Sequence, residues 1–310
     1  MSSSSASAAG SRVRVTDELG EADREALASL VAGARAADGV APLNEHTSLQ
    51  LHGVVPGVRH VVTHADGELT GYAQIELPPA GVDFHEPASV ELVVGPAHRR
   101  RGLGTALATR ALAEAVGRPV LAWAHGTTPG AEVLADRIGF VAVRSLLQMS
   151  RGLDDVAEPA DPPAGMRIRT FVPGQDEDAW LAVNAAAFAH HPEQGRWTPA
   201  DLAAREAERW FDPAGFFLAE TVTTPVRVVG FHWTKTEDGA GEVYVVGIDP
   251  SAQGGGLGKI LLLTGLRYLK ARGCTVVDLY VEADNTAARA LYERQAFAVH
   301  VTHTMYRRES

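Results

Sequence analysis

The chain has 310 residues, of which 45% are hydrophobic, 21% charged and 6% aromatic. This length predicts two domains, and this composition excludes a chain that is disordered throughout. The formal net charge of −10 argues against a nucleic-acid partner, because a protein that binds along the phosphates needs a basic face. The single cysteine, Cys274, excludes an intramolecular disulfide and every multi-cysteine metal site.

The N-terminal residues 1–11 are rich in Ser and Ala, and we expect them to be disordered. They lack the continuous apolar stretch of a secretion signal, and no run of 18 apolar residues occurs in the sequence. A lone cysteine is typical of a reducing compartment. These features predict a cytoplasmic protein with no membrane partner.

The first half predicts strands and helices in alternation. Apolar residues 60–63 and 69–77 flank Asp66-Gly67, which is a strong hairpin signal. A buried strand at 92–94 is followed by a glycine-rich turn, a helix over 103–116 and a strand at 120–124. A short helix then leads to Gly139-Phe140. This order predicts an α/β domain at residues 12–150.

The second half predicts the same elements in the same order. Strands at 217–220, 227–234 and 243–246 precede a second glycine-rich turn, a helix over 257–269, a strand at 276–281 and a short helix. We therefore expect a second α/β domain at residues 166–310. The stretch 151–165 between the halves is polar and rich in proline, and predicts a linker.

The two glycine-rich turns belong to an internal repeat. VELVVGPAHRRRGLGTAL begins at Val90, and VYVVGIDPSAQGGGLGKIL begins at Val243. Placing Pro96 on Pro250 also aligns two glycines of each turn, at a constant separation of 154 residues. Duplication of one domain is the simplest explanation.

A glycine-rich turn that opens a helix presents unpaired N–H groups and the positive end of the helix, which together bind phosphate. A Walker A loop is excluded, because Ile260 follows Gly258-Lys259 where Ser or Thr is required. The dinucleotide fingerprint is excluded in both copies, because Leu107 and Leu261 stand where a small residue is required. Arg/Gln-x-x-Gly-x-Gly remains, and it resembles the coenzyme A pyrophosphate loop of the GNAT acyl-CoA-dependent N-acetyltransferases.

Longer segments resemble one family within GNAT, the mycothiol acetyltransferases. They are ELVVGPAHRRRGLGTA from Glu91, WAHGT from Trp123, AFAHHPEQGRWT from Ala187, WFDPAGF from Trp210 and LYVEADNTAARALY from Leu279. The resemblance implies two tandem GNAT domains, each with a mixed sheet of the α+β type. It also implies acetyl transfer from acetyl-CoA to the cysteinyl amine of cysteinyl-glucosaminyl-inositol, the final step of mycothiol biosynthesis. Only the second half is expected to be catalytic.

Two residues of the second half are candidates for proton transfer. An amine must lose a proton as it attacks a thioester, and the leaving thiolate must gain one. Glu242, at the start of the buried strand, is the expected base. Tyr292, on the helix after Asp284-Asn285, whose side chains suit an N-cap, is the expected acid. The first half has Ala88 and Ala135 at the matching positions, so it lacks both groups.

The turns and the resemblance imply which residues hold the ligands. For acetyl-CoA these are Leu92, Val93, Val94, Arg100, Arg101, Gly102, Leu103, Gly104 and Thr105 in the first half, with Val246, Gly247, Ile248, Gln253, Gly254, Gly255, Gly256, Leu257, Gly258, Lys259, Asn285, Thr286, Ala287, Ala288, Arg289 and Ala290 in the second. For the thiol-sugar acceptor they are Glu45, Glu193, Lys235, Glu242 and Tyr280. Glu45 would have to reach the acceptor from the first half.

Three further expectations complete the sequence-based hypothesis. None of the twelve histidines lies in a metal-binding motif, so we expect no metal, and we expect a monomer. A GNAT enzyme for another amine is one alternative, although a polyamine would favour an acidic pocket rather than one that contains Lys235. A non-catalytic acetyl-CoA-binding regulator is the other, and the presence of both Glu242 and Tyr292 argues against it.

Overall fold

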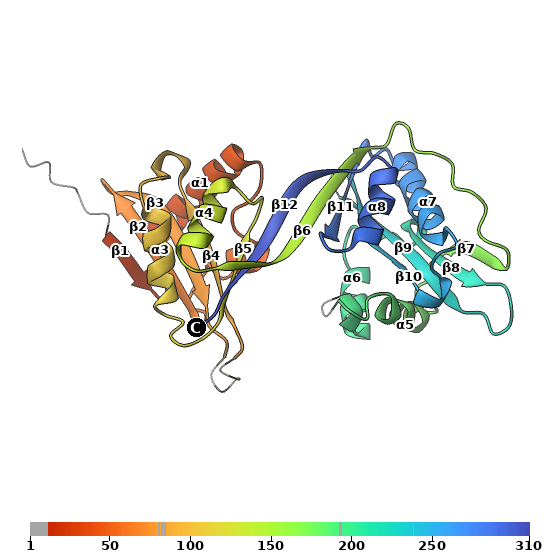
Figure 1. Ribbon diagram of the computed structural model, residues 1–310, viewed down its shortest axis with the longest axis horizontal. Coiled ribbons are helices and arrows are strands. Elements are labelled where there is room, and N and C mark those ends of the chain that lie inside the picture. The colour runs from red at the N-terminus through yellow and green to blue at the C-terminus, as the bar shows by residue number, and fades with distance from the viewer. Residues whose placement is uncertain (1–11, 80, 82, 84, 192–193, 238) are drawn as a thin grey trace, which may run out of the picture. The chain divides into compact units, whose positions relative to one another are not determined.

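The computed structural model describes residues 12–79, 81, 83, 85–191, 194–237 and 239–310 (Figure 1). The chain forms two compact units. The first comprises Met1–Leu147, Glu282–Asp284 and Val301–Ser310, and the second comprises Gln148–Val281 and Asn285–His300. The predicted disorder of residues 1–11 lies outside the described residues. Within the described ranges, no helix is long and apolar enough to cross a membrane.

The first unit contains a mixed sheet. Its strands, in order across the sheet, are β1 (Arg12–Thr16), β2 (Val58–Ala65), β3 (Glu68–Glu76), β4 (Ala88–Val94), β5 (Val120–Ala124) and the end of β12 (Ala298–Arg308). Only β4 and β5 are parallel, and the other neighbours run antiparallel. Asp66 and Gly67 between β2 and β3 both have positive φ, 51° and 85°, as a tight hairpin turn requires. The predicted hairpin is confirmed.

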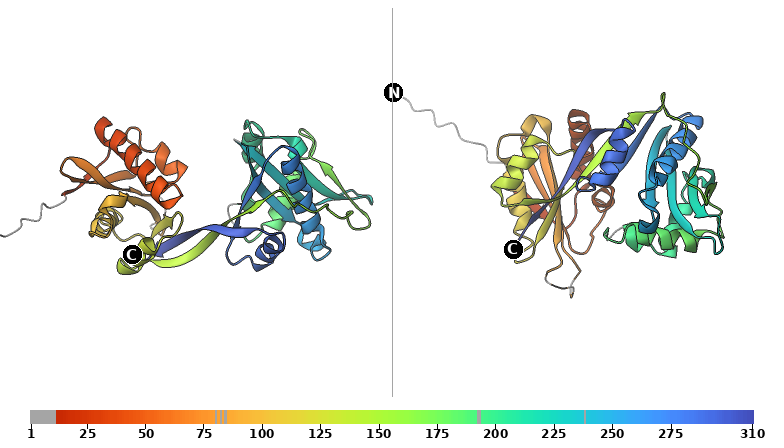
Figure 2. Two further views of the ribbon diagram at one scale, coloured as in Figure 1. Left: turned by 90° about the horizontal axis from the view of Figure 1, so that it is seen from above. Right: turned by 45° about the vertical axis from the view of Figure 1, so that its right-hand side comes forward.

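Helices cover both faces of this sheet (Figure 2). They are α1 (Glu21–Asp38), α2 (Glu45–Leu49), α3 (Leu103–Leu112) and α4 (Pro129–Arg137). On β2, Val62 packs in the cluster that contains α1, whereas its neighbour Val61 packs in the cluster that contains α3. This alternation along the strand gives each face its own apolar core.

The second unit repeats the plan. Its strands, in order, are the end of β6 (Val141–Gly152), β11 (Val276–Glu282), β10 (Ala240–Ile248), β9 (Val228–Glu237), β8 (Phe216–Thr221) and β7 (Met166–Thr170). Here β10 and β11 are the parallel pair, the counterpart of β4 and β5. The predicted fold class, tandem α/β domains with a mixed sheet, is confirmed.

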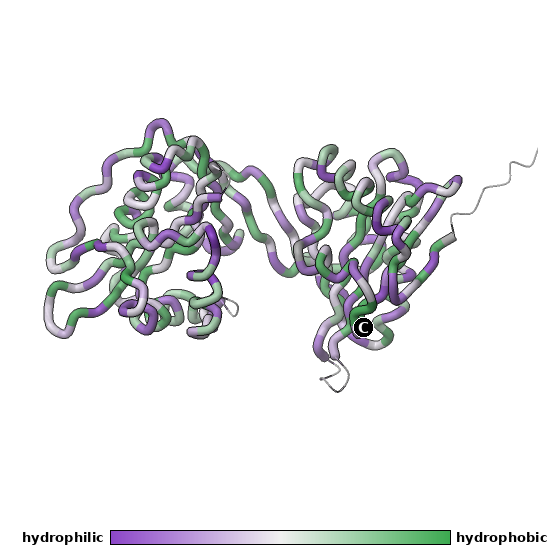
Figure 3. The backbone as a smooth tube through the Cα atoms, turned by 180° about the vertical axis from the view of Figure 1, so that it is seen from behind, coloured by the Kyte–Doolittle hydropathy of each residue, from purple (hydrophilic) through white to green (hydrophobic). Residues whose placement is uncertain are grey.

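The helices of the second unit are α5 (Glu177–Ala187), α6 (Pro199–Glu206), α7 (Leu257–Ala271) and α8 (Thr286–Arg294), with short 3-10 helices η2 (Gln194–Arg196), η3 (Pro213–Gly215) and η4 (Pro250–Ala252). Adjacent residues of β9 point to opposite helices. Trp233 packs against Trp180 of α5, with ring centroids 5.7 Å apart, while His232 Nδ1 lies 2.8 Å from the carbonyl oxygen of Leu261 in α7. Figure 3 shows hydrophobic and hydrophilic stretches interspersed along the chain in both units.

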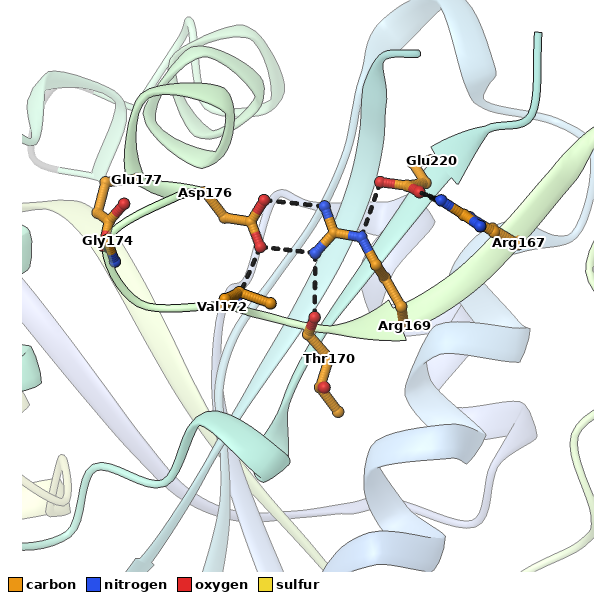
Figure 4. A network of polar contacts seen from close by, with 8 residues as sticks. All are labelled: Arg167, Arg169, Thr170, Val172, Gly174, Asp176, Glu177 and Glu220. Atoms are coloured by element: carbon orange, nitrogen blue, oxygen red, sulfur yellow. Dashed lines mark hydrogen bonds and ion pairs between the residues drawn. The ribbon is translucent and has the colours of Figure 1, made fainter.

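A salt-bridge network fixes the start of α5 to β7 and β8 (Figure 4). The guanidinium group of Arg169 binds both carboxylate oxygens of Asp176, at 2.6 and 2.8 Å, and its Nε donates to Glu220 at 2.9 Å. Glu220 is 2% exposed and is bound by Arg167 as well. Both buried carboxylates, those of Asp176 and Glu220, therefore have arginine partners.

The sequence repeat is also a structural repeat. Arg99 Nε donates to the carbonyl oxygen of Val94 at 3.1 Å, and Gln253 Nε2 donates to that of Ile248 at 3.2 Å. Both members of the second pair lie 154 residues after those of the first. Each bond ties a glycine turn, which follows the 3-10 helix η1 (Pro96–His98) or η4, to the end of its central strand.

The observed domain boundaries differ from those predicted from the sequence in the last strand of each repeat. Residues 304–308 of β12 pair with 120–124 of β5, which places the C-terminus in the first unit although we had assigned 166–310 to one domain. The matching place beside β11 is taken by β6. Because β6 extends to Gly152, the connecting segment begins after that residue rather than at Arg151. Backbone pairing of β5 with β12 explains the difference.

Candidate active site

The second glycine turn leaves main-chain donors exposed at the start of α7. Gly256, the N-cap residue, has φ of 80°, and no side chain caps the helix. A Cβ atom built on Gly254, Gly255 or Gly256 would meet nothing within 4 Å. No side chain therefore caps the start of α7, and the glycines before it leave open space, as a phosphate site requires.

The structure brings the other predicted cofactor residues of the second unit close to this turn. A Cβ atom on Gly258 would lie 3.7 Å from Leu291 of α8, so the first turn of α7 packs on α8. Asn285 caps α8 as predicted, because its Oδ1 accepts the N–H of Ala288 at 3.1 Å. Lys259 is exposed beside the turn. Hydrogen-bond donors and a cation suit a pyrophosphate, and their contact with acetyl-CoA remains a prediction.

The parallel strands β10 and β11 separate beyond the candidate base. Their pairing ends at Val243 and Leu279, whereas β10 remains paired with β9 up to Ile248. The register shifts at Tyr244, between Val243 and Val245. One edge of residues 246–248 therefore faces the gap between the strands, where their backbone groups can bind a ligand.

Glu242 lies on β10 just before this gap. Across the sheet it is opposite Lys235 of β9 and beside Asp278 of β11. Burial raises the pKa of Glu242 above its ordinary value, while the charge of Lys235 opposes this and the charges of Asp278 and Glu237 add to it. A carboxylate with a raised pKa is a stronger base than an exposed one.

Lys235, Tyr280 and two aromatic residues surround Glu242. Lys235 Nζ is 2.8 Å from Glu237 and lies 5.2 Å from the ring centroid of Trp210. Trp210 packs on Tyr244 at 4.8 Å between centroids, and both rings are half-buried. Tyr280 is 49% exposed. Burial, followed by the charge of Glu242, raises the pKa of Tyr280.

The sequence analysis named Lys235 and Tyr280 but not the two rings. Trp210 was part of a quoted motif, WFDPAGF, and Tyr244 follows Glu242 by two residues. Because alternate residues of a strand lie on the same face, the position of Tyr244 two residues after Glu242 could have identified it as a site residue. The contact between Trp210 and Lys235 joins segments that no sequence period connects.

Tyr292 is buried on α8 and is 5% exposed. Its ring packs on Phe297 at 5.8 Å between centroids. Burial raises the pKa of Tyr292 above its ordinary value, so the phenol keeps its proton at neutral pH. Among the described residues none forms a hydrogen bond with its hydroxyl, which leaves that proton available to a ligand.

Two predicted acceptor residues cannot be placed. Glu193 lies outside the described residues. Glu45 is the first residue of α2 in the first unit, but its side chain is not among those described. Their roles remain predictions.

The first unit has a cavity of about 870 Å³ beside its own glycine turn. Most of the cofactor residues predicted for this half line it, namely Leu92, Val93, Val94, Arg100, Gly102, Gly104 and Thr105. Gly102 has φ of 83° and no side chain caps α3, as at α7. Arg99 donates to both carboxylate oxygens of Asp38, at 2.7 and 2.6 Å. Its neighbours Arg100 and Arg101 are exposed and can contact a ligand.

The candidate proton-transfer positions of the first unit carry alanine. Ala88 is fully buried and Ala135 is 8% exposed at the edge of the cavity. Across the part of the chain that the structure describes, no group of three or more His, Cys, Asp or Glu residues could hold a metal ion.

Comparisons with known proteins agree with this geometry. The family model described as "Acetyltransferase (GNAT) family" matches residues 36–140 and 182–297, one match in each repeat. The chain is 51% identical to "Mycothiol acetyltransferase" of Streptomyces avermitilis, over 97% of each chain. It is 50% identical to the protein of the same name from Geodermatophilus obscurus, over 96% of this chain and 97% of the relative.

Solved structures show the same tandem arrangement. A GCN5-related N-acetyltransferase from Sphaerobacter thermophilus has a TM-score of 0.71 and 27% identity, over 96% of this chain and 95% of that one. A tandem GNAT protein from the clavulanic acid biosynthesis pathway has a TM-score of 0.67 over 96% of this chain and 98% of that one. Its identity is 19%, so it supports the fold alone.

Proposed function

We propose that this chain, which belongs to the mycothiol acetyltransferase family of the GNAT N-acetyltransferases, catalyses the final step of mycothiol biosynthesis. The reaction transfers acetyl from acetyl-CoA to the cysteinyl amine of cysteinyl-glucosaminyl-inositol. The observation that carries the proposal is Glu242, a partly buried base opposite Lys235, placed where the central strands of the second unit separate.

Glu242 acts as the base in this proposal. Bound acetyl-CoA supplies the activated acetyl thioester. A cysteinyl α-amine has a pKa of roughly 8, so much of it is already neutral near physiological pH and the base has little work to do. Glu242 accepts the amine proton directly or through a water molecule, and its raised pKa strengthens it for that task.

Tyr292 acts as the acid, and the strand edge orients the reacting group. The buried phenol donates its proton toward the departing sulfur. Those backbone N–H groups of residues 246–248 that point into the gap between β10 and β11, on the strand edge that β9 does not occupy, polarise the acetyl carbonyl. The glycine turn from Gln253 to Lys259 and the start of α8 hold the rest of the coenzyme.

The acceptor binds beside Lys235 and Tyr280. The ammonium group and the phenol can donate hydrogen bonds to sugar and inositol hydroxyls. The rings of Trp210 and Tyr244 offer half-buried apolar faces next to these polar groups. A pseudo-disaccharide has both hydroxyls and apolar C–H faces, and the mixed surface suits it better than an acidic pocket would.

The first unit binds acetyl-CoA but does not acetylate this acceptor. Its turn, cavity and exposed arginines support binding, whereas Ala88 and Ala135 replace the base and the acid. We further propose that the protein works as a cytoplasmic monomer without a metal.

The direct test is incubation with acetyl-CoA and the cysteinyl acceptor while CoA thiol release is followed. We expect release that requires the acceptor, and none above background with the sugar that lacks cysteine. A panel of aminoglycosides and polyamines tests the alternative GNAT function. Faster turnover with a member of that panel than with the cysteinyl acceptor would reject the proposed substrate.

A further inference from the structure

The first unit contains a carboxylate–imidazole pair that the proposed reaction does not use. The carboxylate of Glu91, on β4, is 6% exposed, and its Oε1 lies 3.0 Å from Nε2 of His125. Its other oxygen accepts the backbone N–H of Asn44 at 2.9 Å. A carboxylate only accepts hydrogen bonds, so Nε2 carries the hydrogen and Nδ1 is left as a basic nitrogen.

This pair lies where the two parallel strands of the first unit separate. Pairing of β4 with β5 ends at Val90 and Ala122. Glu91 is the next residue of β4, and His125 follows the last residue of β5. The imidazole lines the cavity that also borders the glycine turn. Of the described residues, only Glu91 forms a hydrogen bond with the ring.

The repeat shows that the fold does not require this pair. The residue 154 positions after Glu91 is Val245, a buried apolar residue of β10. A buried carboxylate loses hydration that a valine does not need, so the substitution of one for the other within a duplicated fold points to chemistry rather than packing. The carboxylate–imidazole arrangement orients the ring and fixes its tautomer, as in activated nucleophile systems.

The segment before α2 covers the pair. A Cβ atom on Gly126 would lie 2.6 Å from Cγ1 of Val40, so this segment lies directly on the turn after His125. Asn44 closes the side next to Glu91 through its N–H group. The rings of Trp123 and His303 flank the imidazole, with centroids 6.3 and 5.7 Å away. The imidazole is therefore 19% exposed and borders the cavity, where water can reach it.

We infer that His125, oriented by Glu91, is the general base of a second thioester site in the first unit, which hydrolyses acetyl-CoA with water as the nucleophile. The inference rests on the proposal that this unit binds acetyl-CoA. His125 Nδ1 takes a proton from water as its oxygen forms a bond to the acetyl carbon. The carbon–sulfur bond breaks, and the sulfur takes the proton from the imidazolium. The products are CoA thiol and acetic acid, which releases its proton to solvent as acetate.

The activity test uses the full chain with the second unit silenced by E242Q and Y292F. CoA release from acetyl-CoA is followed without an acceptor. We expect a slow rate above that of buffer, lowered by His125→Asn roughly 10²-fold or more, or to the buffer rate, because general bases contribute about 10²–10⁴-fold. Glu91→Gln should also lower it. His52→Asn, at an exposed histidine of the same unit, should leave it unchanged.

Two further measurements separate chemistry from structure. Imidazole should restore part of the rate to His125→Gly more than it accelerates the buffer reaction, which a purely structural role would not produce. In ¹⁵N spectra, the His125 ring should show the Nε2–H tautomer and shift when acetyl-CoA is added. A ring that does not respond to acetyl-CoA, or a rate that is the same in His125→Asn, would overturn the inference.

Calorimetry distinguishes this inference from the proposal beneath it. Binding of acetyl-CoA to the first unit without any hydrolysis that depends on His125 rejects the inference and leaves the proposed coenzyme site intact. Absence of binding to the first unit rejects both. Transfer to the cysteinyl acceptor in the wild-type protein is independent of either result, because it requires only the second unit.

Discussion

Glu242 lies directly across the β9–β10 ladder from Lys235, and the charge of Lys235 shifts the pKa of Glu242 in the direction opposite to burial. Burial raises the pKa of the Glu242 carboxyl, and the ammonium group of Lys235 limits that rise. The pair therefore balances two needs of a base. The carboxylate must be strong enough to take the proton and must still be ionised at working pH.

Replacing Lys235 should move the acidic limb of the pH profile. The base is active when deprotonated, so kcat/KM falls as pH drops through the pKa of Glu242. Lys235→Met removes the charge that lowers this pKa, and the limb should shift to higher pH than in the wild type. The measurement is kcat/KM against pH, with Lys270→Met on α7 as the control. A limb that stays in place or moves to lower pH would exclude Glu242 as the group observed.

Removing the carboxylate should remove most of the turnover. Glu242→Gln keeps the shape and the hydrogen-bonding capacity of the side chain but cannot take a proton. We expect kcat to fall roughly 10²-fold or more, with the affinity for acetyl-CoA unchanged. Activity within threefold of the wild type would mean that another group accepts the amine proton.

Tyr292→Phe should lower kcat roughly 10²-fold or more with little change in melting temperature. The hydroxyl has no hydrogen bond to any described residue, so its loss leaves no described partner unsatisfied. Tyr268→Phe is the matched control, because that hydroxyl donates to Asp212 in the same unit, away from α8. We expect the control to lower stability rather than kcat. A lower melting temperature of Tyr292→Phe with unchanged kcat would show that Tyr292 serves packing.

Each glycine turn should hold one acetyl-CoA, so that calorimetry finds two sites in the wild-type chain. Gly255→Asp adds a negative charge where there is open space and no positive φ. Arg101→Asp replaces a positive charge with a negative one at the matching exposed position of the first unit. Each should weaken one site at least tenfold and leave the other unchanged. Gly255→Asn controls for size without charge. One site per chain, insensitive to Arg101→Asp, would contradict coenzyme binding by the first unit.

The network around Arg169 should make stability depend on acid. The hydrogen bonds of Arg169 lower the pKa of Asp176, so the carboxylate stabilises the fold above its unfolded pKa of about 3.9. That contribution is lost as pH falls through the lower folded pKa. Asp176→Asn should therefore flatten the fall in unfolding free energy below about pH 4. The measurement is denaturant unfolding across this range.

Breaking the same network at its centre should cost more. Arg169→Met leaves Glu220 with Arg167 alone and Asp176 without its cation. Removal of one partner from a buried pair costs up to about 3–5 kcal/mol, and Arg167 should reduce this cost. Arg227→Met is the control, because Arg227 is exposed and lies 3.8 Å from Asp249. It should lower the free energy of unfolding by about 0–1 kcal/mol, as is usual for a surface ion pair.

The sequence predicted those features that depend on short-range chemistry. Glycines with positive φ, the hairpin at Asp66-Gly67 and the cap at Asn285 each follow from local backbone preferences. The duplication was visible because both turns keep a glycine with positive φ, Gly102 and Gly256, at the same separation of 154 residues as the rest of the repeat. The resemblance to the mycothiol acetyltransferases implied that Glu242 and Lys235 bind the acceptor, and the ladder between β9 and β10 explains why the two residues lie side by side.

Features that depend on long-range pairing were not predictable in this way. Glu91 lies in an apolar run that reads as an ordinary buried strand, and its partner His125 is 34 residues away. The contact of Trp210 with Lys235 also joins separate segments. The strand that pairs with β5 in the first unit comes from the opposite end of the sequence. The alternation of apolar residues along a strand does not indicate which sheet the strand joins.

The position of β12 sets an order of events during synthesis. Strand β5 emerges from the ribosome with residues 120–124, but the strand that pairs with its free edge follows much later in the chain, as residues 304–308. An exposed strand edge is open to pairing with other chains. The first domain is thus completed only after residues 304–308 have been made, and a chain that stops before residue 304 would leave the edge of β5 without this partner.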